Sequence, residues 1–230
     1  MSNLHADSIR KTFDGRNILN DIFISCHQGE IVGLLGRNGS GKSTLLKVIF
    51  GSLNADYKFV SVDEKKTGKL YSTRHLIRYL PQHNFLPDHK KIKHIISCFC
   101  NSTNAIEIRD NNLIKPLLEK KAKEISGGER RIVEVLLMVY SEAKILLFDE
   151  PFNGISPINV ETIKTIFKSH SKDKAIIITD HDYENVINIS SRIVLMQDGN
   201  TRIIKDLTEL VDFGYLPQAV CKANLLENLD

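Results

Sequence analysis

The feature that most constrains the fold of this chain is the glycine-rich stretch GRNGSGKST at residues 36–44. It fits the pattern G-x-x-x-x-G-K-[ST], in which glycines let the backbone turn so that successive N–H groups point inward at phosphate oxygens. The apolar run EIVGLLG at 30–36 precedes it, and KSTLLKVIF at 42–50 follows with helical spacing and a glycine stop at Gly51. A buried strand before the loop and the positive end of a helix after it argue against a chance glycine-rich turn and predict a nucleotide site.

Two side chains of this loop carry specific chemistry. We expect Lys42 to reach the β- and γ-phosphates and the Ser43 hydroxyl to help hold Mg²⁺. The loop alone does not specify which nucleotide binds or what its hydrolysis drives. The loop residues expected to contact the nucleotide are Gly36, Asn38, Gly39, Ser40, Gly41, Lys42, Ser43 and Thr44.

Two adjacent acids, Asp149 and Glu150, end the apolar run KILLF at 144–148. Ligands of open α/β sheets bind beyond the carboxyl ends of the strands, so both acids arrive near Lys42 if their strand lies beside the one that ends at Gly36. One carboxylate then suits Mg²⁺, and the other could orient and deprotonate an attacking water. The alternative, a strand-end pair that serves solvation or helix capping, is disfavoured by the phosphate-binding loop in the same chain.

Composition narrows the class of protein. The chain has 230 residues, 42% of them hydrophobic and 26% charged, which is enough for a sizeable core. The net charge of +3 is small and the basic residues are scattered, so no nucleic-acid partner is expected. The N-terminus has no apolar core typical of a secretory signal, and the longest apolar stretch, 132–140, contains Glu134 and is short of the roughly 18 residues of a membrane span. We therefore expect a soluble chain that can still dock on a membrane protein.

The four cysteines form no C-x-x-C pair and have no histidine cluster near them. The C-F-C at 98–100 could be a fragment of a metal site. We favour buried or incidental thiols in a reducing compartment. The cysteines are Cys26, Cys98, Cys100 and Cys221.

Strands made of continuous apolar runs alternate with helical patterns, which favours an α/β core with a parallel sheet. An antiparallel portion precedes it, because Asp14-Gly15 is a hairpin turn between two strand-like segments. Residues 88–121 hold apolar patches around an Asn-rich loop and are expected to form a small helical lobe. The expected strands are 3–13, 17–26, 30–36, a pair within 57–80 around the polar loop 63–69, 144–149, 174–179 and a terminal hairpin at 192–205, and the expected helices are 42–50, 128–141, 157–169 and 183–190.

The segment ISGGER at 125–130 resembles the Leu-Ser-Gly-Gly-Gln signature of ATP-binding cassette (ABC) ATPases, with Glu129 in place of glutamine. KTF at 11–13, YLPQ at 79–82 and ITDHD at 178–182 match the family's adenine-stacking, Q-loop and switch motifs in the required order. The resemblance implies a P-loop NTPase fold of the α/β class, with a parallel-sheet core, an antiparallel β subdomain and a small helical lobe.

The resemblance covers roughly residues 5–205. It implies that residues 1–230 form a single ABC ATPase domain. Its helical lobe then spans about 83–125, and a C-terminal tail follows at 206–230. In members of this family, the partner subunits bind to this lobe.

The family's functional residues carry over one by one. Asp149 is expected to bind Mg²⁺, Glu150 to activate the water, Gln82 to contact Mg²⁺ and the γ-phosphate, His181 to donate to the γ-phosphate, and Phe13 to stack on adenine. Each has a plain alternative. Phe13 could belong to the core, Gln82 to a surface loop, and His181 could be an ordinary hydrogen-bonded polar residue.

In the family, the signature residues Ser126, Gly127 and Gly128 face the γ-phosphate of ATP bound by a second cassette. The resemblance therefore implies a dimer, of identical or different cassettes, that closes around two ATP molecules. The alternative is a simple helix cap, since Ser126 followed by Glu129 is itself a capping box. Both roles can hold together.

Most cassettes without membrane spans are ATPase subunits that drive separate membrane permeases from the cytoplasmic face. The wording of ISGGERRIVEV, DEPFNGISPINVETIK and ITDHDYENV is similar to the branched-chain amino acid and lipopolysaccharide-export group. A non-transport cytosolic cassette, such as the iron–sulfur cluster assembly type, shares all the ATP motifs and remains the alternative. A small-molecule kinase is disfavoured by SGGE and His181.

One position departs from the family. The loop after the paired acids usually ends in an aspartate that couples the two nucleotide sites, and this chain has Ser156 there. A hydroxyl carries no charge, so we expect this coupling to be weaker or rebuilt.

Overall fold

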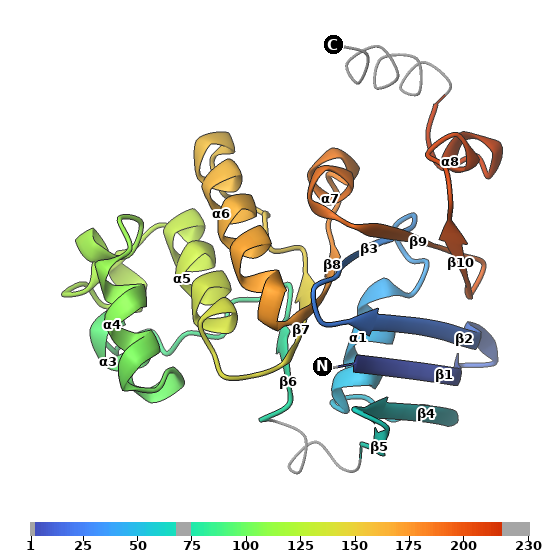
Figure 1. The fold of residues 1–230 in the computed structure, drawn as a ribbon, viewed down its shortest axis with the longest axis horizontal. Coiled ribbons are helices and arrows are strands. Elements are labelled where there is room, and N and C mark those ends of the chain that lie inside the picture. Colours follow the sequence, from blue (N-terminus) through green and yellow to red (C-terminus); the bar gives the residue numbers. More distant parts are fainter. Residues whose placement is uncertain (1–2, 68–74, 218–230) are drawn as a thin grey trace.

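The computed structural model describes residues 3–67 and 75–217 and contains two β-sheets (Figure 1). The first is antiparallel, with strand order β2-β1-β4-β5. The predicted hairpin is confirmed, because β1 and β2 pair through a turn in which Asp14 and Gly15 both have positive φ. The strands are β1 (Asn3–Phe13), β2 (Arg16–His27), β4 (Tyr57–Val62) and β5 (Lys65–Lys66).

The second sheet has the order β10-β9-β3-β8-β7-β6 and is parallel except for the edge strand β10. This confirms the predicted parallel core and terminal hairpin. The strands are β3 (Ile31–Leu35), β6 (Ile77–Leu80), β7 (Ile145–Asp149), β8 (Ala175–Thr179), β9 (Arg192–Gln197) and β10 (Asn200–Ile204).

The predicted strand pair within 57–80 is present but placed differently, because its second strand, β5, falls inside the expected polar loop 63–69. β4 pairs with β1 and with the short β5, whereas β6 belongs to the other sheet, where it pairs with β7. Local sequence indicates a strand but not its partner, because the choice depends on contacts with distant segments. The predicted polar loop 63–69 is described only to residue 67.

The predicted helices lie within one or two residues of the observed ones, and the predicted lobe contains two helices followed by short 3₁₀ turns. Within the described ranges, no helix is long and apolar enough to cross a membrane. The helices are α1 (Lys42–Phe50), α3 (Ile92–Phe99), α4 (Ser102–Asp110), α5 (Gly127–Val139), α6 (Pro157–His170), α7 (Tyr183–Ile189) and α8 (Glu209–Asp212), and the 3₁₀ turns are Lys115–Leu117, Ala122–Glu124 and Ser171–Asp173.

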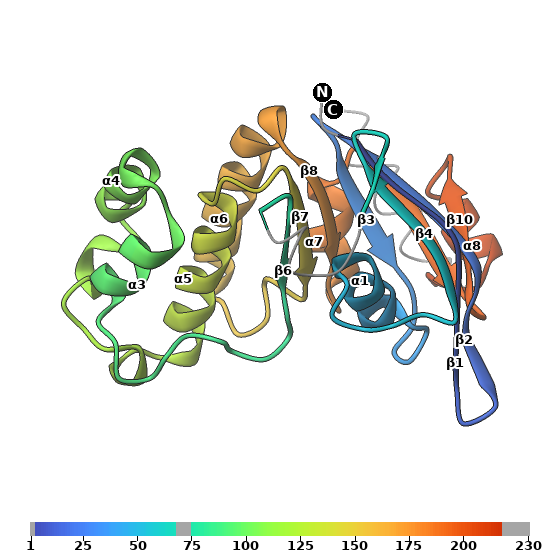
Figure 2. The ribbon, with the colours of Figure 1, turned by 90° about the horizontal axis from the view of Figure 1, so that it is seen from below.

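Side chains on the two faces of the parallel sheet belong to two separate cores. Leu146 and Phe148 of β7 pack with α5, α6 and α7, whereas Ile145 and Leu147 pack with α1 and the antiparallel sheet. Figure 2 shows α5 and α6 on one side of β7 and α1 on the other. This period-two alternation puts α1 and α5 on opposite faces of one sheet.

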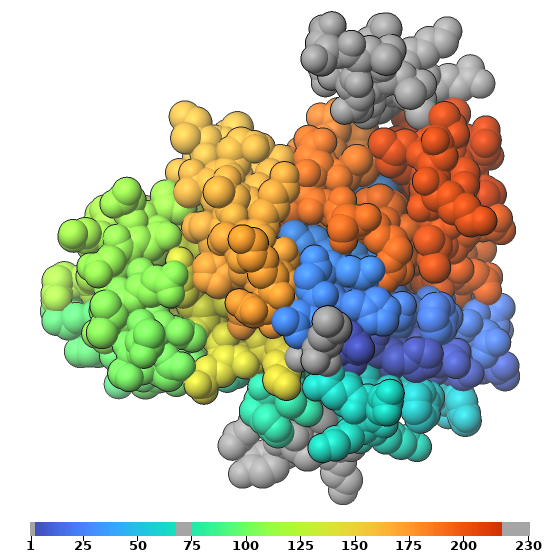
Figure 3. Space-filling view, viewed as in Figure 1, coloured from blue at the N-terminus to red at the C-terminus, as the bar shows by residue number. Residues whose placement is uncertain are grey.

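The helical lobe forms one end of the molecule, away from both sheets (Figure 3). At the other end the C-terminal strands lie beside the N-terminal hairpin, where the Thr201 hydroxyl donates to the carbonyl of Phe23 at 2.7 Å. The fully buried Ile92, Ile96 and Ile108 of the lobe belong to the same apolar core as α5 and one face of the parallel sheet.

The described cysteines are free thiols. Burial raises the pKa of Cys26 to about 12 and that of Cys100 to about 11, so neither is a ready nucleophile. Cys98 is exposed, and Cys221 lies outside the described residues. Among the described residues there is no group of three or more His, Cys, Asp or Glu side chains that could hold a metal ion, so the C-F-C segment is not part of such a cluster.

Gly33 of β3 offers a test of this packing. A Cβ there would lie 2.5 Å from the Ser190 hydroxyl and 2.7 Å from a methyl of Val186, so Gly33→Ala pushes α7 off the sheet. We expect a loss of about 1–3 kcal/mol in the free energy of unfolding, measured by urea titration. Gly127→Ala is the matched control, because a Cβ at Gly127 meets open space and its stability should be unchanged or higher.

Candidate nucleotide-binding and hydrolysis site

The phosphate-binding loop runs from the end of β3 into α1, and its glycines are needed for close approach. A Cβ on Gly36 would lie 2.5 Å from the carbonyl oxygen of Met196. Gly41 has φ of 104° and is the N-cap of α1 without a side-chain cap. No acidic residue lies in the first turn of α1. The N–H groups of this helix end therefore remain available for an anion, as the sequence predicts.

A cavity of about 500 Å³ lies against this loop. Every residue that lines it except Ile18 is one that the sequence analysis selected. Gly36, Ser40 and Asp149 are not among its described lining residues. The lining residues are Phe13, Ile18, Asn38, Gly39, Gly41, Lys42, Ser43, Thr44, Gln82, Glu150 and His181.

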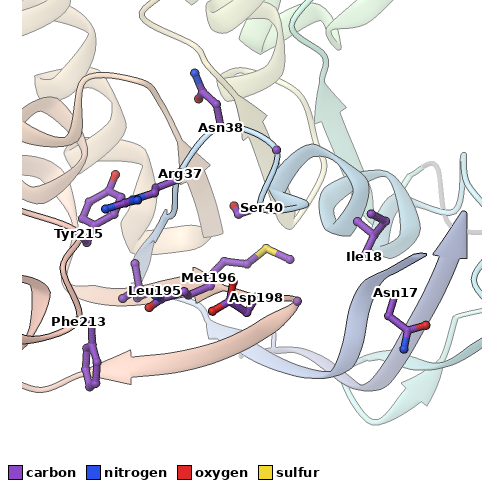
Figure 4. A pocket seen from close by; sticks show the side chains of 13 residues that line it. Asn17, Ile18, Arg37, Asn38, Ser40, Leu195, Met196, Asp198, Phe213 and Tyr215 are labelled. Atoms are coloured by element: carbon purple, nitrogen blue, oxygen red, sulfur yellow. The ribbon is translucent and has the colours of Figure 1, made fainter. Parts of the chain in front are cut away.

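A second cavity, of about 510 Å³, lies beside the same loop (Figure 4). Arg37 and Ser40 of the loop line it, together with Met196 of β9 and Tyr215 near the C-terminus. None of the predicted catalytic residues is among its lining residues in the described chain. The predicted catalytic residues Lys42, Glu150 and His181 therefore gather at the first cavity.

Asp149 reaches the loop although its strand is not the neighbour of β3, because β8 lies between β3 and β7. The Ser43 hydroxyl donates to Asp149 Oδ1 at 3.0 Å, and the Tyr79 hydroxyl donates to Oδ2 at 2.9 Å. Hydroxyl and carboxylate oxygens are the hard ligands that Mg²⁺ prefers, so this pair fits the ion together with phosphate and water oxygens. Tyr79 is a contact that the sequence analysis missed.

Glu150 sits at a strained backbone position with φ of 55° and is almost fully buried. Its Oε1 accepts a hydrogen bond from Gln82 Nε2 at 2.6 Å and lies 2.7 Å from His181 Nε2. Burial raises the pKa of this carboxyl, and the charges of Asp149 and Asp180 add to the increase while His181 opposes it. A raised pKa makes the carboxylate a better base.

Lys42 folds back onto its own loop in this structure. Its Nζ donates to the carbonyl oxygens of Gly36 at 2.6 Å and Arg37 at 3.2 Å. Burial lowers the pKa of Lys42, and the carboxylates of Asp149 and Glu150 act in the opposite direction. A phosphate would offer the ammonium group a charged acceptor in place of these carbonyls.

Phe13 does not belong to the core. It ends β1, is 42% exposed and lines the cavity, and the Lys11 ammonium lies 4.8 Å from its ring centroid. An exposed aromatic face at the cavity suits a stacked base.

The signature residues lie elsewhere. Ser126 caps α5 in a full capping box with Glu129, as the alternative predicted. A Cβ on Gly128 would lie 2.5 Å from the carbonyl oxygen of Gly154, so Gly128 is needed where α5 meets the loop that follows Glu150. Ser126, Gly127 and Gly128 are not among the described residues that line the 500 Å³ cavity.

Sequence reasoning missed Arg131, which is 3% exposed. Its guanidinium donates to the carbonyl oxygens of Asp149 at 2.6 Å, Glu150 at 2.9 Å and Pro81 at 2.7 Å. Its charge is balanced by the fully buried Glu134, 3.3 Å away. Arg131 thus joins the signature helix to the catalytic strand end and to the segment that carries Gln82.

Glu134 extends this network. Its Oε1 accepts hydrogen bonds from the backbone N–H groups of Phe85 at 2.8 Å and Leu86 at 3.4 Å. Burial raises the pKa of Glu134, and these N–H groups and Arg131 oppose that increase. The sequence signal that could have identified this pair was an acid in an apolar helix, Glu134, three positions after an arginine.

Comparison with known proteins decides the family. Residues 19–153, more than half of the chain, match the sequence profile of the ABC transporter family. The chain belongs to this family. Its ATP-binding domains are ATPases, and this cassette is one of them. The resemblance to ABC ATPases that the motifs indicated is therefore confirmed.

Named relatives agree. The lipopolysaccharide export system ATP-binding protein LptB of Escherichia coli (strain K12) is 31% identical over 225 residues, which cover 87% of this chain and 89% of the relative. The ABC transporter ATP-binding protein YtrB of Bacillus subtilis (strain 168) is 28% identical and covers 88% of this chain and 71% of the relative.

Solved structures confirm the predicted fold. A nucleotide-free ATP-binding cassette from an ABC transporter superposes with a TM-score of 0.79 at 22% identity. The match covers 96% of this chain and 98% of that structure. MJ1267, an ATP-binding cassette of an ABC transporter, gives 0.74 at 25% identity and covers 87% and 90%.

The Arg131 network generates a prediction. Arg131→Met removes the nearer and more buried of the two guanidinium groups paired with Glu134, a fully buried carboxylate, so we expect a loss of about 3–5 kcal/mol in the free energy of unfolding, measured by denaturant titration. The double variant Arg131→Met/Glu134→Gln removes both charges, and the amide oxygen can still accept a backbone N–H. It should recover part of that loss; a double variant no more stable than Arg131→Met would contradict the pairing.

Proposed function

We propose that this cassette binds and hydrolyses Mg²⁺-ATP as one half of a dimer that drives separate membrane subunits. The observation that carries the proposal is the cluster in the 500 Å³ cavity, where Glu150 Oε1 lies within 2.7 Å of both Gln82 Nε2 and His181 Nε2. A buried carboxylate, an amide and an imidazole beside a phosphate-binding loop suit a water-activating centre.

The phosphates would lie along the loop, with Lys42 donating to their β- and γ-oxygens and Phe13 stacking on the adenine. Ser43, Asp149 and Gln82 would hold Mg²⁺, since the Ser43 hydroxyl lies within 3.4 Å of both other side chains. When bound, Mg²⁺ neutralises charge that develops on the transferring phosphoryl group.

Glu150 would take a proton from the attacking water, since its pKa is raised and it lines the cavity. The His181 side chain is about half exposed, and its Nε2 lies beside Oε1 of Glu150. When ATP is bound, this Nε2 could donate to the γ-phosphate instead of contacting Glu150. Gln82 directly precedes the helical lobe in the chain. A movement of Gln82 when the γ-phosphate binds or leaves could therefore be transmitted to a protein bound to the lobe.

A dimer would complete the site. Within one chain the signature residues and the cavity are apart, because α5 and α1 cover opposite faces of the sheet (Figure 2). Ser126, Gly127 and Gly128 would close the cavity of a second cassette, identical or different. Beside Ser156, the large apolar side chain of Ile158 is 82% exposed, which suits a protein contact.

The named relatives favour a transport role over the cytosolic iron–sulfur alternative. One is described as part of a lipopolysaccharide export system and the other as an ABC transporter ATP-binding protein. By analogy, this cassette would sit peripherally at the cytoplasmic face of a membrane and contact integral permease subunits through its lobe, residues 83–125.

Removing the base tests the proposal. Glu150→Gln keeps the shape of the side chain but cannot accept the proton of water, so we expect ATP to stay bound and to hold two cassettes together. Light scattering in saturating Mg²⁺-ATP should show a dimer, with ATP turnover reduced by about a hundredfold or more. Lys42→Ala in the same background should bind no ATP and stay monomeric, and a monomeric Glu150→Gln at saturating ATP counts against the assignment.

Ser156 allows a second test. It is the N-cap of α6 but makes no side-chain cap hydrogen bond. Ser156→Asp restores the charge common in the family, and we expect a higher Hill coefficient for ATP hydrolysis. Ser156→Asn is the matched control, because it can cap the helix equally well without the charge. An unchanged coefficient and rate in Ser156→Asp would make the substitution unimportant.

A further inference from the structure

Two segments on neighbouring strands meet at the catalytic carboxylate. One is the loop 151–156 that follows Glu150, and the other is 180–182, which surrounds His181. The backbone N–H of Glu150 donates to the carbonyl of Thr179 at 2.8 Å, and His181 reaches the Glu150 side chain. These two contacts join the segments only at Glu150 itself.

A third contact lies beyond Glu150 and is made by Asp180, a residue that the proposed mechanism does not use. Asp180 Oδ2 accepts the backbone N–H of Phe152 at 3.1 Å, and Oδ1 accepts the N–H of Asp182 at 3.2 Å. The side chain is 7% exposed. Burying a carboxylate is unfavourable unless hydrogen bonds compensate, so both oxygens are committed to these two segments.

The loop held by Asp180 runs from the catalytic centre to the surface. Phe152 is buried with its ring edge-on to Phe167 at 6.0 Å, and the carbonyl of Gly154 lies against Gly128 of the signature helix. The chain then becomes exposed and reaches Ser156. A force on the exposed end of this loop would therefore act on Phe152 and on the carboxylate that binds it.

We propose that Asp180 is a positioning residue that couples the loop 151–156 to the switch residue His181. Because its two oxygens bind N–H groups on both segments, a shift of the loop moves Asp180 and, with it, the histidine that faces Glu150. The inference rests on the proposed function, in which a second cassette contacts the exposed end of this loop. When a second cassette binds, a shift of the loop would thus change the position of His181 relative to Glu150 through Asp180.

A purely structural role for Asp180 predicts different behaviour. If Asp180 only secured the end of β8, its loss would lower stability, ATP affinity and turnover together. A positioning role leaves the phosphate-binding loop intact, because within the described residues Asp180 accepts hydrogen bonds from Phe152 and Asp182 and not from residues 36–44. ATP affinity should then be retained while turnover and dimer closure suffer.

The principal variant is Asp180→Asn, which keeps the volume but has only one oxygen for two N–H groups. We expect kcat for ATP to fall on the order of tenfold or more, as for a small misplacement of a catalytic group, while the Kd for ATP stays within about twofold. In the Glu150→Gln background, the same change should raise the ATP concentration needed for dimerisation by a similar factor.

Asp182→Ala is the matched control. Asp182 flanks His181 on its other side and caps α7 by accepting the N–H groups of Glu184 and Asn185. Its removal deletes a carboxylate from the same loop but keeps the Phe152 contact, so kcat should stay within about twofold of the parent. A tenfold loss in this control as well would overturn the proposal, since any disturbance of the loop would then suffice.

Hydrogen exchange of Asp180→Asn gives a readout independent of catalysis. Faster exchange confined to 151–156, with the parallel sheet still protected, supports the coupling. Unchanged kcat and dimerisation, or a parallel loss of kcat, ATP affinity and sheet protection, would overturn it. If Glu150→Gln alone fails to dimerise with ATP, the proposed function fails instead, and the two failures are thus distinguishable.

Discussion

The buried guanidinium of Arg131 is the contact on which the catalytic edge of this cassette depends. Three main-chain carbonyls converge on it, from Asp149, Glu150 and Pro81, and Glu134 balances its charge. A carbonyl at a strand end has no ladder partner, so the arginine satisfies groups that would otherwise be costly to bury. One side chain of the signature helix thereby sets the position of both acids and of the segment that presents Gln82.

This arrangement explains how residues from distant segments come together at one cavity. The loop after β3 supplies N–H groups, the end of β7 supplies carboxylates, and the segments after β6 and β8 supply Gln82 and His181. Parallel strands bring their carboxyl ends to one edge, so the sheet concentrates these groups without any of them being neighbours in sequence. The strained backbone at Glu150 is tolerated because Arg131 and Thr179 hold its carbonyl and N–H.

The contacts between loops form a continuous path across the molecule. Gly128 of the signature helix touches the loop after Glu150, and Asp180 ties that loop to the switch segment. The same helix binds the segment 81–88 through Arg130, Arg131 and Glu134. The loop 151–156, the segment 81–88 and the 500 Å³ cavity are therefore linked by buried polar contacts, which suits the proposed coupling of ATP to an external partner.

Much of this protein could be predicted from its sequence. The phosphate-binding loop, the paired acids, the alternating strands and helices, and the order of the family motifs depend on local patterns, and most of the residues they selected line one cavity. Strand partners were not predictable in the same way: β4 and β6 read alike along the chain but joined different sheets, and β8 came to lie between β3 and β7. Arg131, Glu134, Tyr79 and Asp180 escaped notice for a related reason, because each makes a key hydrogen bond to a group far away in sequence. Sequence by itself determined which chemical groups this cassette carries; only the tertiary structure decided which of them share a hydrogen bond, since that depends on long-range packing that no local pattern encodes.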